Sequence, residues 1–275
     1  MQNPTANTVT TSVKMEDLQL AQRTVGEIVA EDFRRGAVLK TFGIDFCCGG
    51  GKSLADAAGK AGVEVEDVTN AIAISDSHGQ DYGSQSRMAA WKPGFLADYI
   101  VNEHHSYVRE SIPVLRAFTQ KVARVHGGER PELVEIAELF EAVAAELETH
   151  MAAEEDIVFP RIKNLEPGSG DGGASVQGLR ALIDEMEGDH DRAGEAMRQI
   201  RKLASDFVPP VGACNTYRAS FAKLEEFEED LHRHVHLENN VLFPKALALE
   251  DAAQSTPASP AVDACSDKAP APSAE

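Results

Sequence analysis

One pattern occurs twice in the second half of the chain and constrains its fold more than any other feature. The two copies are His150–Pro160 and His234–Pro244, and both follow H-x-x-x-E-x-x-[IV]-[VL]-F-P. Residues four positions apart lie on one face of an α-helix, so each copy presents an imidazole and a carboxylate side by side. Such a pair can chelate a metal ion, and the repeat predicts two helices that each contribute one pair.

Four long amphipathic helices are predicted from residue 93 onward. The periodic spacing of apolar residues, with Pro or Gly at the boundaries, places them at about 94–125, 131–160, 174–206 and 214–247. Short connections between consecutive helices are typical of antiparallel neighbours. We therefore predict an all-α protein whose antiparallel four-helix bundle occupies residues 93–248.

A smaller helical unit is predicted in front of the bundle. Residues 15–75 contain short helical patterns around a CCGGGK turn, and the polar, turn-rich stretch 76–92 is interpreted as a linker. The two ends of the chain, 1–14 and 249–275, lack periodic apolar spacing and are predicted to be disordered tails.

The two predicted helices outside the repeat each carry a histidine at a comparable place. One helix plus one turn fits the interval between consecutive histidines, so a bundle can bring all four to a similar depth. The candidate metal ligands are His105, His150, Glu154, His190, His234 and Glu238.

This ligand set suits iron, manganese or zinc better than calcium, and two ions better than one. If Glu154 and Glu238 both bridge, each ion receives two nitrogens and two carboxylate oxygens. A solvent-derived oxo or hydroxo bridge would add a fifth ligand and leave one position on each ion for a small molecule.

The neighbouring histidines are harder to place. His232 and His236 point to other sides of the helix than His234 does, so both are predicted to lie on the surface. Helical phase alone does not separate His104 from His105, because either can join the apolar stripe of the first long helix.

Two further histidines and three cysteines have other interpretations. His126 at a predicted helix end complements the helix dipole, and His78 in the linker is given no role. Cys214 is interpreted as a small buried hydrophobic residue. The adjacent Cys47 and Cys48 cannot form a relaxed disulfide, which favours metal binding or thiol exchange, with two buried structural thiols as the alternative.

Charge and cysteine usage restrict the partners. Twenty-six Lys and Arg residues against 45 Asp and Glu residues give a net charge of −19, which repels phosphate backbones and anionic lipid surfaces. This argues against nucleic acid and membranes as partners. The four cysteines do not form the pattern of a secreted disulfide framework, and the first residues lack the apolar run of a secretory signal. We therefore expect a cytoplasmic protein.

These motifs resemble those of the repair-of-iron-centres proteins, a di-iron hemerythrin-like family implicated in restoring iron–sulfur clusters damaged by nitric oxide or peroxide. The resemblance covers about residues 18–248. It rests on FGIDFCCGG at 42–50, DYI at 98–100, EGDHDRAG at 187–194, LENNVLFP at 237–244 and the two His/Glu pairs. The match to the family motif supports His105 over His104 as the ligand.

The resemblance implies a di-iron protein that repairs iron–sulfur clusters after nitrosative or oxidative stress, by donating iron from a labile His/Glu site. Its partners would be damaged iron–sulfur proteins, the gases NO and O2, and a second copy of the chain bound through the front domain. Cys47 and Cys48 would handle iron or nitrosyl groups. Two alternatives use the same ligands: a nitric oxide reductase that yields nitrous oxide, and a sensor that binds O2 or NO.

Two positions depart from the oxygen-carrying hemerythrins that the chain also resembles. Those carriers have a second histidine where this chain has Gly194, and a carboxylate where it has Asn239. A site with fewer ligands is more open, which favours iron release or gas chemistry over reversible storage of dioxygen.

Overall fold

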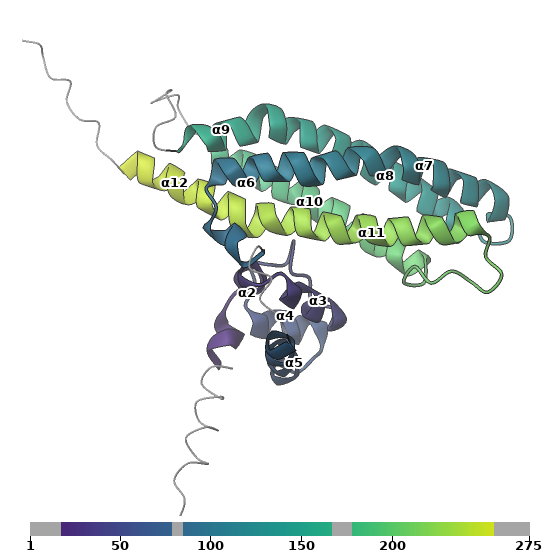
Figure 1. Cartoon of the computed structure of the whole chain (residues 1–275), viewed down its shortest axis with the longest axis horizontal. Coiled ribbons are helices and arrows are strands. Elements are labelled where there is room, and N and C mark those ends of the chain that lie inside the picture. The colour runs from purple at the N-terminus through teal and green to yellow at the C-terminus, as the bar shows by residue number, and fades with distance from the viewer. Residues whose placement is uncertain (1–17, 79–84, 167–177, 256–275) are drawn as a thin grey trace, which may run out of the picture.

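The computed structural model describes residues 18–78, 85–166 and 178–255, and within these ranges the chain forms helices and no strand (Figure 1). An isolated bridge joins Thr24 to Ser53. The prediction of an all-α protein is confirmed. Among the described residues, no helix combines the length and the apolar character needed to cross a membrane.

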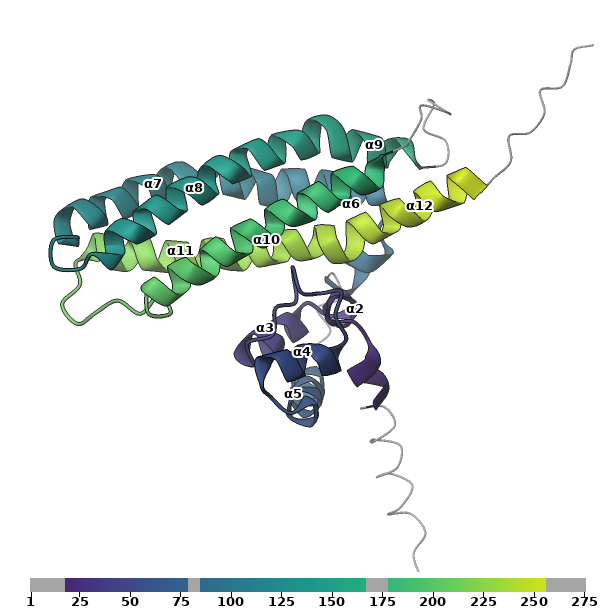
Figure 2. The same ribbon diagram turned by 180° about the vertical axis from the view of Figure 1, so that it is seen from behind.

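Four long helical segments run side by side and form the bundle (Figures 1 and 2). The first segment consists of α6 (Pro93–Ile100), η2 (Val101–His105) and α7 (Ser106–His126). The second consists of α8 (Glu132–Ala153), η3 (Glu154–Val158) and α9 (Phe159–Asn164). The third is α10 (Leu179–Leu203). The fourth consists of α11 (Asn215–Leu237), η4 (Glu238–Leu242) and α12 (Phe243–Ser255).

The apolar faces of these segments make a continuous core. Leu115, Phe140, Leu224 and Phe227 are fully buried, and the rings of Phe140 and Phe227 meet edge to face with centroids 5.6 Å apart. Truncating a buried phenylalanine to alanine typically costs about 3–5 kcal/mol, so this packing holds the far half of the bundle together.

Three of the four long segments change from α-helix to π-helix at the metal-site end of the bundle: η2, η3 and η4. Proline explains two of these changes. Pro160 and Pro244 follow η3 and η4 by two residues, and each lacks a backbone N–H while its ring crowds the carbonyl four residues earlier. A wider turn relieves both problems, and such turns are common at functional sites. The F-P ending of the repeat therefore marks a π-helical turn.

The described part of the front domain includes the short helices α2 (Val25–Glu31), α3 (Arg34–Thr41), α4 (Leu54–Ala61) and α5 (Val65–His78). Side chains satisfy exposed backbone amides at two helix starts. Thr24 and Glu27 form a capping box on α2, and Ser53 accepts a hydrogen bond from the backbone of Asp56 in α4. Gly62 ends α4 in the left-handed conformation with φ of 74°.

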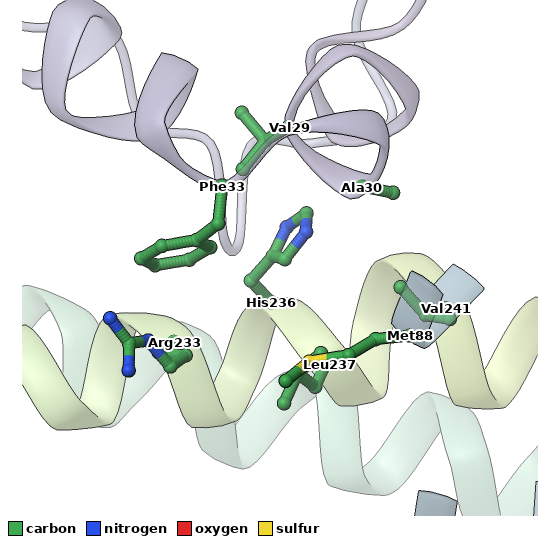
Figure 3. A pocket seen from close by; sticks show the side chains of 8 residues that line it. All are labelled: Val29, Ala30, Phe33, Met88, Arg233, His236, Leu237 and Val241. Carbon is green, nitrogen blue, oxygen red and sulfur yellow. The ribbon is translucent and has the colours of Figure 1, made fainter. Parts of the chain in front are cut away.

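This domain packs against α11 and η4 (Figures 1 and 3). Phe33 and Phe46 contact the ring of His236, with centroids 5.8 and 5.9 Å away. Lys40 reaches the buried carboxylate of Glu228 at 2.9 Å, and Arg201 of α10 binds the same carboxylate. One ion-paired glutamate therefore ties the front domain to two helices of the bundle.

The prediction that His232 and His236 lie on the surface is wrong. His236 is buried, its pKa is lowered to about 4 by burial, and His232 is half-buried beside Phe46. Both residues do point away from the bundle core, as their helical phase requires, but the front domain covers that face of α11.

Helix boundaries also differ from the prediction: the second segment ends at Asn164 rather than at 160, and α10 ends at Leu203 rather than at 206. The helix α12 continues to Ser255, so the prediction of disorder from residue 249 is wrong for 249–255. The predicted linker 76–92 contains the end of α5 and a short 3-10 helix, η1 (Gln85–Ala90). The predicted tail 1–14 and residues 256–275 lie outside the described residues.

The interpretation of Cys214 as a buried residue is also wrong. It is exposed at the N-cap of α11, at the end of the bundle farthest from α12 (Figure 1). His126, the last residue of α7, places its Nε2 atom 3.4 Å from the Cys214 sulfur. Hydrogen bonds from His126 and from backbone amides lower the pKa of this thiol.

Candidate metal centre

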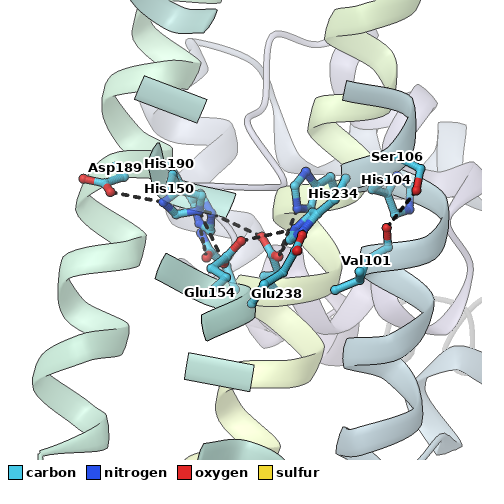
Figure 4. A network of polar contacts seen from close by, with 12 residues as sticks. Val101, His104, Ser106, His150, Glu154, Asp189, His190, His234 and Glu238 are labelled. Carbon is cyan, nitrogen blue, oxygen red and sulfur yellow. Dashed lines mark hydrogen bonds and ion pairs between the residues drawn. The ribbon is translucent and has the colours of Figure 1, made fainter. Parts of the chain in front are cut away.

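The structure brings all six candidate ligands together inside the bundle. Figure 4 shows His150, Glu154, His190, His234 and Glu238 among them. The four long segments each supply one histidine, and the second and fourth segments add a glutamate at the first residue of a π turn. Each of the six side chains is at most 3% exposed. The four segments thus bring their histidines to the common depth that the sequence predicted.

The ligand atoms form two overlapping groups, each within 4.8 Å. We call them position 1, which consists of His105, Glu154, His234 and Glu238, and position 2, which consists of His150, Glu154, His190 and Glu238. Both glutamates belong to both positions.

Each glutamate lies between histidines of the two positions. The oxygens of Glu154 are each 3.3 Å from an imidazole Nε2, one from His105 and the other from His150. Glu238 is 3.0 Å from Nε2 of His234 through one oxygen and 3.2 Å from Nε2 of His190 through the other. A carboxylate that faces two imidazoles in this way is placed to bridge two cations.

Three of the four histidines are hydrogen bonded on the opposite side of the ring. His105 Nδ1 donates to Glu155 at 2.5 Å, and His150 Nδ1 donates to Asp189 at 3.1 Å. His190 Nδ1 donates to Asn239 at 2.7 Å. An acceptor on Nδ1 fixes the tautomer that leaves the Nε2 lone pair free for a metal.

The phenylalanines of the repeat complete the same environment. Phe159 stacks on His105 with ring centroids 5.7 Å apart, and Phe243 stacks on His190 at 6.3 Å. The F-P ending of each copy therefore does more than shape the backbone, because its aromatic ring covers a histidine from the neighbouring helix.

His104 is buried beside the site but belongs to neither position. Its Nδ1 pairs with Asp230 at 2.9 Å, and its ring stacks on His234 at 5.5 Å with an interplanar angle of 7°. The ambiguity that helical phase left between His104 and His105 is therefore decided by geometry, since only His105 faces the glutamates.

When no cation is bound, electrostatics favour charged glutamates and protonation of His105 and His150, whereas burial lowers the pKa of His234. Burial lowers the pKa of His105, but Glu154 and Glu238 outweigh it and raise that pKa to about 10. The pKa of His150 is raised to about 9 in the same way, against its burial. Burial raises the pKa of Glu238, but the surrounding histidines outweigh it and hold the value well below the usual range. The pocket therefore stabilises two adjacent negative charges that require cations.

Unpartnered buried atoms show that the site fits metal ions. Both oxygens of Glu154, one oxygen of Glu238 and Nε2 of His105 make no hydrogen bond to any described residue. Burying such atoms is costly unless they are paired, and metal ions would pair them. Two nitrogens and two carboxylate oxygens at each position suit iron, manganese or zinc.

The cysteine loop lies directly against this site. Asp45 accepts hydrogen bonds from the backbone amides of Cys47 and Cys48, and Cys48 Sγ is 3.5 Å from the carbonyl oxygen of His190. A Cβ atom on Gly194 would lie 3.4 Å from that sulfur. Hydrogen bonding to Cys48 and burial raise the pKa of Cys47. Asp45, Cys47 and Cys48 form a third cluster of possible metal ligands.

The family models match both parts of the chain. Residues 96–246 match a model described as Hemerythrin HHE cation binding domain, and residues 21–75 match ScdA_N, a domain of unknown function.

The chain is 36% identical over 231 residues to the iron–sulfur cluster repair protein YtfE of Pectobacterium atrosepticum, which covers 82% of this chain and 96% of the relative. It is 33% identical over 221 residues to the iron–sulfur cluster repair protein ScdA of Staphylococcus haemolyticus, which covers 80% of this chain and 96% of that protein. The chain belongs to the iron–sulfur cluster repair family. The family resemblance seen in the sequence is thereby confirmed.

Sequence reasoning missed the three acceptors behind the ligand histidines. Glu155 and Asn239 each directly follow a repeat glutamate, and Asp189 directly precedes His190. A polar residue next to a ligand in the sequence is the signal that would have found them, because adjacent helical residues diverge toward neighbouring helices.

Proposed function

We propose that the bundle holds two iron ions, one at each position, with Glu154 and Glu238 bridging them. The observation that carries the proposal is that both His/Glu groups contain both glutamates. Two ions that share two carboxylates would satisfy the unpartnered oxygens of the site, and the histidines would then be terminal ligands. These are His105, His150, His190 and His234.

We propose that the protein repairs iron–sulfur clusters damaged by nitrosative or oxidative stress, by donating this iron. Support comes from its relatives, which are named iron–sulfur cluster repair proteins. The ligand set adds a physical reason. Each position has two neutral imidazoles and two shared carboxylates and no thiolate among the grouped residues, so an iron–sulfur protein that offers thiolates and sulfide can compete for the metal.

The partners in this proposal are damaged iron–sulfur proteins in the cytoplasm and the small gases NO and O2. A homodimer through the front domain is part of the proposal as well. Sedimentation tests the dimer directly, and a monomer at micromolar concentration would contradict that part alone.

The first experiment is metal analysis with optical and Mössbauer spectra of the anaerobically purified chain. Two irons per chain with antiferromagnetic coupling are expected. One zinc, or no metal after expression with ample iron, would contradict the proposal.

The second experiment tests iron donation. The iron-loaded chain is mixed with a protein that carries a damaged [3Fe–4S] cluster, together with dithionite. Each cluster takes up one ferrous ion and one electron to become [4Fe–4S], and the iron content of the donor falls equally.

A chain that keeps both irons and reduces NO over many turnovers would instead be a nitric oxide reductase. In that reaction two NO, two protons and two electrons give nitrous oxide and water. Reversible gas binding with retention of iron would identify a sensor.

A further inference from the structure

The sequence repeat gives the two metal positions an internal symmetry in the structure. In each copy of the repeat, the residue after the glutamate crosses to a histidine on a neighbouring helix: Glu155 reaches His105, and Asn239 reaches His190. The phenylalanine of each copy stacks on the same histidine. The two halves of the site are therefore built alike on this side.

The symmetry extends to the residues that precede His105 and His190. Asp189 directly precedes His190 and accepts a hydrogen bond from His150 on the second segment. By the same relation His104, which directly precedes His105, lies against His234 on the fourth segment. His104 therefore occupies the place of an acceptor for His234.

His104 does not act as that acceptor (Figure 4). Its ring stacks parallel to that of His234, and its own Nδ1 is committed to Asp230. In the described part of the chain, Nδ1 of His234 makes no hydrogen bond, although the side chain is 1% exposed. Stacking orients the His234 ring but supplies no acceptor.

The two positions consequently differ in one hydrogen bond. Position 2 has an acceptor behind each of its histidines, whereas position 1 has one only behind His105. An acceptor on the outer nitrogen raises the basicity of a ligand imidazole, and its removal typically costs about 10–100-fold in metal affinity. We infer that the ion at position 1, held by His105 and His234, is the one that the protein gives up first. This inference rests on the proposed iron donation and names which iron is donated.

The experiment follows iron leaving the full-length, iron-loaded chain. A ferrous chelator is added in excess under anaerobic conditions, and the coloured complex is recorded with time, while samples frozen during the reaction give Mössbauer spectra. We expect one iron per chain to leave in a fast phase and the second in a slow phase at least about ten times slower.

Two alanine variants assign the phases to the positions. Glu155→Ala removes the acceptor behind His105 and should accelerate the fast phase by about tenfold or more without changing the slow one. Asp189→Ala removes the acceptor behind His150 and should accelerate only the slow phase. Both side chains are only partly buried and lie on helical segments, so alanine is tolerated there. Exposed neighbours provide the controls Asp156→Ala and Asp191→Ala.

The outcomes separate the inference from the proposed function. Reversed assignments, with Asp189→Ala accelerating the fast phase, would overturn the inference. Loss of both irons in a single phase would also overturn it while leaving iron donation intact. A chain that contains fewer than two irons before the chelator is added would contradict the proposed function itself, and the inference with it.

Discussion

The two copies of the repeat have the same internal design but different surroundings. Both place a glutamate at the start of a π turn and end in a phenylalanine that stacks on a ligand histidine. The outer face of the first copy is exposed at Asp156, whereas the equivalent Asn240 donates hydrogen bonds to the carbonyls of Phe46 and Cys47 in the front domain. The repeated residues build the metal site, and the residues that differ decide what lies around it.

Removal of either glutamate is the largest change that the comparison predicts. Because each carboxylate belongs to both positions, Glu154→Ala and Glu238→Ala should each lower the iron content from two to below one per chain, as measured by elemental analysis. The exposed Glu146→Ala on α8 is the control, and circular dichroism checks the helices. Retention of two irons in both variants would contradict the bridging role.

The next largest effect concerns the stability of the fold and the ion pairs that Glu228 makes with Lys40 and Arg201. Burial raises the pKa of Glu228, but hydrogen bonds from Arg201 and Lys40 outweigh it and lower that pKa in the folded state. The carboxylate therefore stabilises the fold above its unfolded pKa, and this stabilisation is lost as the pH falls through the folded value. Glu228→Gln should cost about 1.5–3 kcal/mol at pH 7.

Chemical denaturation at several pH values measures this effect. The difference between wild type and Glu228→Gln should narrow as the pH falls below 4.5, the ordinary glutamate value. Glu229→Gln, at the exposed neighbouring position, should leave stability unchanged at every pH. A difference that is constant with pH would show that the charge of Glu228 has no role.

A variant that should hold iron more tightly at position 1 sharpens the comparison between the two positions. In His104→Asn, the amide can donate to Asp230 and accept from His234 Nδ1, which gives position 1 the acceptor that it lacks. The fast phase of iron loss should slow by about tenfold, as measured with the chelator. His104→Phe, which keeps the stacked ring without an acceptor, should not slow it.

The smallest effect concerns the outer face of the second copy. Asn240→Ala removes the hydrogen bonds to the cysteine loop, worth about 1 kcal/mol, and should speed alkylation of Cys48 several-fold, as measured by mass spectrometry. Iron content should not change. Asp156→Ala is the matched variant in the first copy. Equal rates of Cys48 alkylation in the two variants would contradict the proposed difference between the copies.

The sequence predicted the bundle and the metal-site residues well because both depend on short-range periodicity. The spacing of His150 and Glu154 places them on one face whatever surrounds the helix. Helix ends were less accurate: α12 continues to Ser255, because residues 249–255 contain no Pro or Gly that would stop the helix earlier.

The errors arose where a second part of the molecule covers a helix or where a loop exposes a residue. His236 follows the surface phase of α11, yet Phe33 and Phe46 of the front domain, far away in the sequence, bury it. Cys214 was expected to be buried from its residue type, but it stays exposed beside His126 at the start of α11. Long-range contacts of this kind leave no mark on local periodicity.

Each π turn amounts to one residue inserted into an otherwise continuous α-helix. An α-helix advances about 100° per residue, so deleting one residue from 155–157 would rotate everything after it by that angle. His150 would keep its place, while Phe159 would turn away from His105. The metal ligands and their aromatic cover thus share a face only through this extra residue, and a one-residue deletion should be far more damaging here than most substitutions.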